Sequence, residues 1–346
     1  MLLSHKYTLV LLSLGVVANA QAAIELTDNV FLSGFGTTSI SKTDNTTPLF
    51  INREITDETC YDCDTLFGLQ LDANIFDGLK ASAQVVKRTQ DDWSDPELEW
   101  AYLSYEFNDF EVRAGRLRLP VFMISEFYFV GQAYVWARPP VEVYDAILGT
   151  TSYDGVSFAW NYELSDELLL TVSPYYGFER TTKVALGSTI FHFESDYTTG
   201  IYLDLTGFNY RIHAGFLQSK YILLPATKPD KLSVYTVGAE YSMDAWQFMA
   251  EVEYDDLQTN WYASVAYAFD GFTPYIVYGE SHDLRESKGV TVGARYDVTP
   301  AISVNAEYQT LTSEDPFNRA QFVAPPIYFG EKEDVDLFSI TINFVF

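Results

Sequence analysis

Hydrophobic and polar residues alternate with a period of two along many short segments of this chain. In AISVNAEYQT (301–310), Ile302, Val304, Ala306 and Tyr308 share one face of an extended segment, and polar residues occupy the other. The same alternation occurs in LFGLQLDAN (66–74), WQFMAEVEY (246–254), GVTVGARYDV (289–298) and the final ITINFVF (340–346). A period of two predicts β-strands that each have one apolar face and one polar face.

Short turn sequences and longer stretches separate these segments in alternation. Fifteen connections are expected, which implies sixteen strands with both chain ends on the side of the short turns, a pattern typical of outer-membrane β-barrels. The seven tight turns are expected at Asp77-Gly78, Asn108-Asp109, Ser165-Asp166, Gly207-Phe208-Asn209, Asp244-Ala245, Asp270-Gly271 and Thr299-Pro300. The eight long connections are expected near 42–64, 89–96, 118–150, 179–197, 220–231, 255–259, 281–287 and 312–334.

The first residues have the features of a bacterial secretory signal. MLLSHKYTLVLLSLGVVANAQAA (1–23) combines a short basic start, an apolar stretch and small residues in A-x-A order near Ala20. The apolar stretch is too short to favour a membrane-spanning helix. We therefore expect residues 1–22 to be a signal peptide and residues 23–346 to form one exported domain.

Alternation alone allows a soluble sheet protein as well as a membrane barrel. Aromatic residues make up 16% of the chain and often end the apolar face of a segment, as in the aromatic girdles of barrels. The formal net charge of −27 argues against nucleic-acid binding, which needs clustered Lys and Arg. The signal, the turn–loop asymmetry and the terminal strand together predict an all-β fold. That fold is a 16-stranded antiparallel transmembrane β-barrel, closed by the last strand onto a first strand near Val30–Ile40.

The third long connection, about residues 118–150, differs from the other loops in composition. The stretch RLRLPVFMISEFYFVGQAYVWARPPVEVYDAILGT (116–150) is rich in aromatic and branched apolar residues. Exposed to water, such a loop would promote association, whereas sixteen strands enclose a lumen too wide for wall side chains to fill. We therefore expect this third extracellular loop to fold inward and narrow the lumen. Its aromatic residues either tune the passage for a solute or only wedge the loop against the wall.

The stretch AYLSYEFNDFEVRAGRLRLP (101–120) resembles the strand–turn–strand segment of Gram-negative general porins. In that family a Gly-Arg pair, matched here by Gly115-Arg116, precedes the loop that constricts the pore. The terminal aromatic residue, Phe346, also matches the family, in which it belongs to a signal read by the assembly machinery. The resemblance implies an outer-membrane channel for small hydrophilic solutes and ions, with a homotrimer among outer-membrane lipids and lipopolysaccharide.

The resemblance also implies a set of pore residues. In such porins, arginines on the wall face carboxylates on the third loop across the lumen. Arg116 is accordingly expected to be the main pore residue, and Arg113 should point inward because it shares the polar phase of Glu111. A purely structural ion pair is the alternative to solute contact for each arginine. The complete expected constriction comprises Arg88, Arg113, Arg116, Arg118, Glu126, Arg138, Glu142 and Asp145.

Cys60 and Cys63 are the two cysteines of the chain and form a C-x-x-C motif in the first outer loop. In an oxidising compartment we expect a local disulfide between them. A redox or metal-binding motif is the alternative, but the four histidines are scattered and no second cysteine pair exists. We therefore expect no metal and no cofactor.

Acidic residues cluster in the expected outer loops. Solvated loop faces are the simplest interpretation, and divalent cations shared with lipopolysaccharide are the alternative. The clusters are Asp91, Asp92 and Asp95, then Glu314 and Asp315, and then Glu331, Glu333, Asp334 and Asp336.

No G-x-S-x-G, H-E-x-x-H or Gly-rich phosphate motif is present, so we expect no enzymatic activity. The leading hypothesis is passive diffusion through a wet lumen that is filtered by size and charge. A substrate-specific channel and a structural barrel that sheathes a partner protein are the alternatives. Acidic positions on the polar faces outnumber basic ones and predict weak cation preference: Asp72, Glu111, Asp204, Glu240, Glu251, Glu253 and Glu307.

Overall fold

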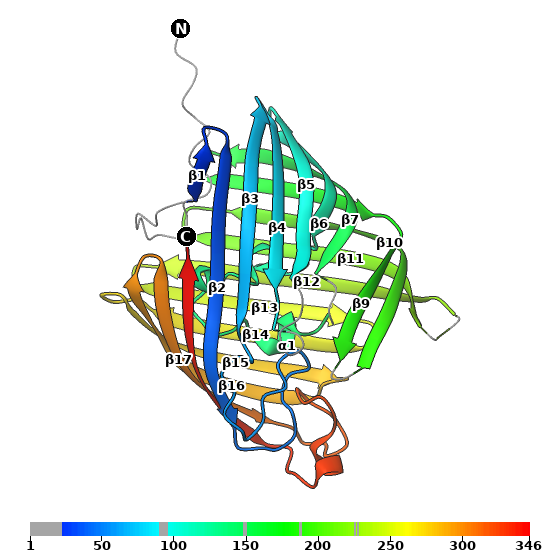
Figure 1. The fold of residues 1–346 in the computed structure, drawn as a ribbon, viewed down its shortest axis with the longest axis vertical. Helices are drawn as coiled ribbons and strands as arrows, with labels where there is room; N and C mark the ends of the chain where they lie inside the picture. The colour runs from blue at the N-terminus through cyan, green and yellow to red at the C-terminus, as the bar shows by residue number, and fades with distance from the viewer. Residues whose placement is uncertain (1–22, 90–95, 148–150, 187–188, 225, 227) are drawn as a thin grey trace.

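The computed structural model describes residues 23–89, 96–147, 151–186, 189–224, 226 and 228–346. In these residues the chain forms a closed antiparallel sheet that wraps into a barrel, with only short helical turns (Figure 1). The expected signal peptide, residues 1–22, lies outside the described residues. None of the helices in the described part has the length and apolar character that a membrane crossing requires.

Sixteen strands make up the wall of the barrel, as the alternation predicts. Two of the labelled segments, β8 (Leu168–Gly177) and β9 (Arg180–Leu186), are parts of one wall strand, because both pair with β10 (Thr189–Thr206). A short strand, β1 (Ile24–Thr27), pairs only with the start of β2 in the described registers. The remaining strands are β2 (Val30–Thr43), β3 (Leu66–Phe76), β4 (Leu79–Lys87), β5 (Glu97–Phe107), β6 (Phe110–Arg118), β7 (Ser152–Ser165), β11 (Tyr210–Leu224), β12 (Asp230–Met243), β13 (Trp246–Asp255), β14 (Gln258–Tyr267), β15 (Phe272–Asp283), β16 (Ser287–Thr299), β17 (Ile302–Thr312) and β18 (Val335–Val345).

The last strand closes the barrel onto the first long strand. β18 pairs with β2 in antiparallel register, from Leu337 opposite Thr43 to Val345 opposite Phe35. Phe346 extends this pairing, since its N–H donates to Gly34 O at 2.9 Å and its carbonyl accepts from Gly34 N at 3.0 Å. Closure removes the open sheet edges that an apolar phase does not tolerate, and it confirms the predicted barrel.

Each predicted tight turn falls at a junction between two consecutive wall strands. The prediction of a long loop over residues 179–197 is wrong, because β9 and most of this part of β10 lie there. Many of these residues are polar or charged, so their composition resembles a loop, yet their backbone pairs from Leu186 opposite Thr189 to Arg180 opposite Ser195. Strand pairing depends on the neighbouring backbone, which composition does not report.

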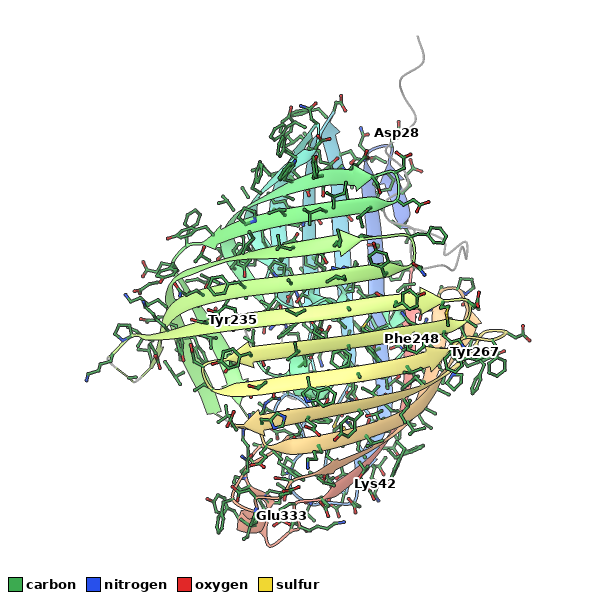
Figure 2. The ribbon with its side chains drawn as sticks, turned by 180° about the vertical axis from the view of Figure 1, so that it is seen from behind. Asp28, Lys42, Tyr235, Phe248, Tyr267 and Glu333 are labelled. Atoms are coloured by element: carbon green, nitrogen blue, oxygen red, sulfur yellow. A yellow bond between two sulfur atoms is a disulfide. The ribbon has the colours of Figure 1, made fainter. Side chains whose placement is uncertain are left out.

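Alternate residues of each strand face opposite sides of the wall. On β18, Phe338 is 50% exposed on the outside, whereas Ser339 and Asn343 on the inside are fully covered. Tyr235, Phe248 and Tyr267 mark the same outward-facing phase on the strands drawn in Figure 2. The wall therefore has an apolar outer surface and a polar inner surface.

Candidate functional site

The third loop, described over residues 119–147 and 151, packs on the inner face of the barrel wall. It contains η1 (Ser125–Phe127), η2 (Gly131–Ala133) and α1 (Val141–Tyr144). Trp136 Nε1 donates to Ser264 Oγ of β14 at 2.9 Å, and Asn305 Nδ2 of β17 donates to Val135 O at 2.6 Å. Because Ser264 and Asn305 belong to the polar phase of their strands, these contacts lie on the luminal side.

Large apolar side chains of the third loop pack against luminal tyrosines. Phe122, Trp136 and Tyr144 are each less than a tenth exposed. They share one cluster with wall residues such as Tyr262 and Tyr275. Burying a side chain of this size stabilises a fold by about 1.5–3 kcal/mol. Most of the aromatic side chains that distinguish this loop therefore hold it on the wall.

A glycine lets the third loop approach the wall closely. Gly131, in η2, lies against Asn343 of β18 and Thr37 of β2, and a Cβ at this position would collide with the Asn343 side chain. The small residue thus permits a close contact at the seam where the barrel closes.

Three arginines outside the third loop bind its backbone in addition to Arg118, and none of these three was among the expected site residues. Each guanidinium donates to loop carbonyls at 2.6–3.3 Å. Their position on the polar phase or at a strand end was readable from the sequence, but their loop partners were not. The bonds run from Arg211 to Met123 O, from Arg285 to Val141 O and Glu142 O, and from Arg295 to Gln132 O and Tyr134 O.

Two wall carboxylates accept hydrogen bonds from the same loop. Glu251 accepts from the Met123 N–H at 2.9 Å and from the Tyr144 hydroxyl at 2.7 Å. Glu307 accepts from the Ala137 N–H at 3.1 Å. Both residues lie on the inner face, as expected, but the loop covers them almost completely. They therefore do not add charge to an open passage, contrary to the reasoning behind the cation preference.

Arg138 links the third loop to the first loop and to the wall. Its guanidinium lies 2.8 Å from Asp64 and 3.4 Å from Glu307, and it donates to Ser339 Oγ at 2.7 Å. Arg53, from the first loop, also binds Asp64, at 2.8 Å. Burial alone would raise the pKa of the Asp64 carboxyl, but Arg138 and Arg53 outweigh burial and hold that pKa below its usual value.

Arg113 and Glu126 face each other between the wall and the third loop. Arg113 Nη1 lies 3.4 Å from Glu126 Oε1, and its other nitrogens pair with Glu111 at 2.9 Å. The guanidinium also lies over the Tyr102 ring, 5.6 Å from its centroid. The side chains of Arg113 and Glu126 are 30% and 49% exposed, so this ion pair remains in contact with water.

Arg88 and Arg118 lie together beside the buried carboxylate of Glu99, with which both form ion pairs. Arg118 also donates to Ser125 O at 2.8 Å and lies over the Phe129 ring, 4.7 Å from its centroid. Both arginines line a cavity of about 100 Å³ between the first loop, the third loop and the wall. They contact the loop but are held by Glu99 rather than by a carboxylate of the loop.

Arg116 does not share the luminal face of Arg113. The two residues are three positions apart on β6, so regular alternation places them on opposite sides of the wall. Arg116 is paired in register with Ala101 and Asp154, and its guanidinium binds Asp154 at 2.7 Å. The resemblance to the Gly-Arg pair of porins therefore does not bring Arg116 beside the third loop.

The two remaining carboxylates of the third loop have different surroundings. Asp145 accepts from the Tyr128 hydroxyl at 3.2 Å and lies 3.5 Å from Arg53, beside the same cavity. Glu142 instead packs against the wall at Gly279 and Gly289 and is almost fully covered. Burial raises the pKa of Glu142 to about 7. Glu142 therefore does not line the open part of the lumen.

The unaltered protein should lose thermal stability as pH rises from 5 to 8, and we expect Glu142→Gln to reduce this loss. The carboxyl has a reference pKa of 4.5 and a pKa of about 7 in the folded protein. As pH rises from 4.5 to 7, the unfolded chain loses this proton first, so folding stability falls; below and above this window the contribution is constant. The full shift corresponds to roughly 3 kcal/mol. Melting curves followed by circular dichroism in detergent would measure the effect.

Glu314→Gln is a matched control for this measurement, because the Glu314 side chain is 80% exposed. The control should keep the pH dependence of the unaltered protein. If the melting temperature of Glu142→Gln falls between pH 5 and pH 8 by as much as that of the unaltered protein, this carboxyl does not carry a buried proton.

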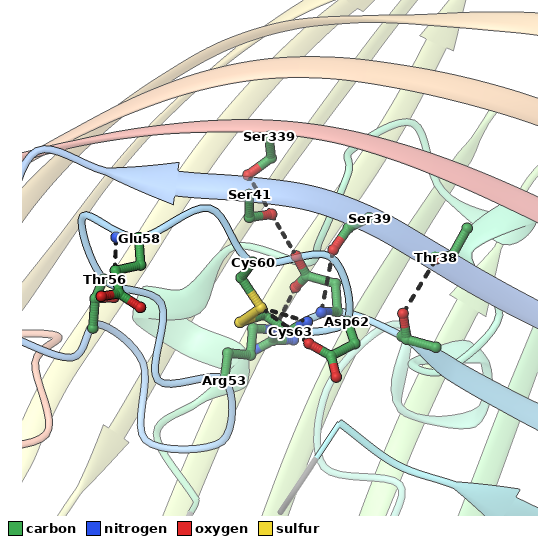
Figure 3. The surroundings of a disulfide bond; sticks show 12 residues. Thr38, Ser39, Ser41, Arg53, Thr56, Glu58, Cys60, Asp62, Cys63 and Ser339 are labelled. Carbon is green, nitrogen blue, oxygen red and sulfur yellow. Dashed lines mark hydrogen bonds and ion pairs between the residues drawn. A yellow bond between two sulfur atoms is a disulfide. The ribbon is translucent and has the colours of Figure 1, made fainter. Parts of the chain in front are cut away.

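Cys60 and Cys63 form a disulfide in the first loop, next to the Asp64 network (Figure 3). With Asp62, they form the group in the described part of the chain whose atoms come close enough to hold a metal ion. Both sulfur atoms are bonded to each other in the disulfide, so neither cysteine can bind a metal ion as a thiolate in this state. Of the acidic loop clusters, Asp91, Asp92 and Asp95 lie outside the described residues.

Comparison with known proteins points to one family. A model of the Gram-negative porins matches residues 8–316. The comparison with curated proteins gives no match.

Solved porin structures share the fold of this chain at low sequence identity. OmpF of Salmonella typhi, in complex with daunomycin, is 15% identical over 92% of this chain and 98% of its own, with a TM-score of 0.62. An anion-selective porin from Comamonas acidovorans is 12% identical over 92% and 99%, with a TM-score of 0.63. In-vitro folded OmpT of Vibrio cholerae, in its trimer form, is 14% identical over 92% and 99%, with a TM-score of 0.56. At these identities the structures support the barrel fold.

Proposed function

Because this chain belongs to the Gram-negative porin family, we propose which residues filter solutes in the channel that it forms. The protein is an outer-membrane channel for the passive diffusion of small hydrophilic solutes, and the family consists of channels rather than enzymes. We propose that the filter lies between Glu126 on the third loop and Arg113 on β6. The observation that carries this proposal is their contact at 3.4 Å, with both side chains open to water.

We propose weak cation preference for this channel, on a smaller set of charges than the sequence suggested. Glu251 and Glu307 are covered by the loop and contribute little. The other inward carboxylates still outnumber the inward arginines near the Arg113–Glu126 pair. They are Glu111, Glu126, Asp204 and Glu240, against Arg113 and Arg211.

Reversal potentials in planar lipid bilayers under a KCl gradient test this proposal. We expect a potential of the sign given by faster K⁺ than Cl⁻ permeation. A potential of the opposite sign would refute the cation preference, because it would mean that the arginines outweigh the carboxylates at the narrowest point. Saturable uptake of one solute class in liposome-swelling assays would instead support the substrate-specific alternative.

We further propose that the protein assembles as a homotrimer. Small residues on the outer face of β3 to β6 support this proposal. A shallow depression there is lined by Ala73, Ala81, Ala83, Ala101 and Ala114. Many of the other strands carry exposed Tyr, Phe or Trp on this face. Chemical cross-linking of the detergent-purified protein would measure the oligomeric state. The third loop occupies part of the lumen, so the structure gives the partner-sheathing alternative no support.

A further inference from the structure

Strand pairing in the barrel wall is interrupted between β7 and β9 at the end where the long loops lie. β7 and β8 pair as far as Gly155 opposite Gly177, and beyond that point β9 pairs with β10 alone. The first residues of β7 therefore lack a strand neighbour on this side, and β9 forms a separate hairpin with β10 (Figure 1). A cavity of about 150 Å³ lies at this interruption.

Four cationic side chains line this cavity. They are Arg88, Arg116, Arg180 and Lys183, and the lining contains one carboxylate, Glu97. Two further carboxylates pair with these cations: Glu99 with Arg88, and Asp154 with Arg116 and Arg180. Four cations therefore face three carboxylates here, whereas the whole chain has 21 Lys and Arg against 48 Asp and Glu. A cavity with this charge favours an anion.

Neighbouring groups hold two of the guanidinium groups in place. Arg180 Nη1 donates to Ser152 O at 2.8 Å and to Ser152 Oγ at 3.0 Å. Arg116 binds Asp154 through Nε at 2.7 Å and through Nη2 at 3.1 Å, and Asp154 lies 3.7 Å from Arg180. Fixed guanidinium planes recognise phosphate oxygens with little further loss of side-chain freedom. Asp154 is the internal anion with which a ligand would compete.

The cavity reaches the outer side of the wall. Arg116 faces away from the lumen, and its Nη1 donates at 3.3 Å to the carbonyl of Leu98, whose side chain is 41% exposed on the outer face. In porins the long loops are extracellular, so the cavity lies at the extracellular end of the strands. Phosphate groups can reach this position from the headgroups of the outer leaflet or from the surrounding water.

We propose that this cavity is a phosphoryl-binding site, in which Arg116, Arg180 and Lys183 contact the oxygens of one phosphate group. Arg88 and Thr151 also line the cavity beside the third loop, so the two cavities adjoin each other. The proposed site does not include Arg113 or Glu126 and does not depend on the proposed filter. Its ligand chemistry is a phosphomonoester or inorganic phosphate, and the source is either a phosphorylated glycolipid or the free ion.

Binding by the full-length protein in detergent tests the proposal with two probes. Native mass spectrometry would compare lipopolysaccharide with the same lipopolysaccharide after phosphatase treatment, and calorimetry would measure inorganic phosphate. We expect the variant with Arg116→Ala and Arg180→Ala to bind at least one of the two phosphate probes tenfold or more weakly than the unaltered protein. If the variant loses binding of the phosphorylated lipid, the lipid supplies the bound phosphate group. If it loses binding of free phosphate alone, the ligand is the soluble ion.

Two single variants keep the test valid if the double variant does not fold. Lys183→Ala changes an exposed side chain and should weaken binding about threefold. Asp154→Asn removes the competing carboxylate and should tighten binding several-fold, whereas a purely structural ion pair predicts no gain. Phosphate binding that is absent from the unaltered protein, or unchanged in both single variants, would overturn the proposal.

Discussion

Replacing Arg113 by alanine should make the channel several-fold more selective for cations. The guanidinium lies between the carboxylates of Glu111 and Glu126, and its removal leaves both negative charges without their partner. One unit charge about 4 Å from a permeating ion changes its energy by ~1 kcal/mol in water and by more at lower dielectric constant. This energy corresponds to about a fivefold change in partition, which reversal potentials under a KCl gradient would measure.

Arg113→Lys is the matched control for this experiment, because it keeps the positive charge but loses the planar pair of donors to Glu111. We expect its selectivity to stay near that of the unaltered channel. If Arg113→Ala leaves the reversal potential unchanged, the narrowest charged point of the channel lies elsewhere. In that case the proposed filter would be wrong, although the fold would stand.

The barrel itself was predictable from local patterns. Alternation in segments such as 301–310 assigns each strand its two faces, and turn sequences such as Asp77-Gly78 mark the junctions. Both signals act over a few residues and need no knowledge of distant contacts. They were less reliable where β9 meets β10, because a polar sequence there extends a hairpin instead of forming a loop.

The site was only partly predictable, because its contacts join residues far apart in the chain. Arg113 and Arg116 illustrate the local part: their odd spacing already places them on opposite faces of a regular strand. Matching the Gly-Arg pair of the family therefore conflicted with alternation, and the structure follows alternation. The distant part includes Arg138, whose partners are 74 and 169 positions away in the sequence. No periodicity reports such partners.

Arg138→Met should loosen the third loop and destabilise the protein by about 3–5 kcal/mol, the usual cost of leaving buried charges without a partner. The Arg138 side chain is 4% exposed. Its removal takes away the cation paired with Glu307, whereas Asp64 keeps its ion pair with Arg53. Methionine keeps much of the side-chain volume, so the lost charge dominates the effect. We expect a lower melting temperature and a noisier, larger single-channel conductance, since the loop would leave the wall more often.

Neutralising all three groups should recover much of this loss. In the variant with Arg138→Met, Asp64→Asn and Glu307→Gln, the remaining buried charge of this cluster, Arg53, keeps its ion pair with Asp145 at 3.5 Å. Uncharged replacements for a buried ion network are often tolerated. Lys288→Met, which breaks an exposed pair with Glu314, should cost less than about 1 kcal/mol. Recovery of stability without recovery of quiet conductance would show that Arg138 also holds the loop through its bond to Ser339. If Arg138→Met and Lys288→Met are equally stable, Arg138 does not hold the third loop on the wall. Loss of a buried cation between two carboxylates should lower the free energy of unfolding more than loss of an exposed cation.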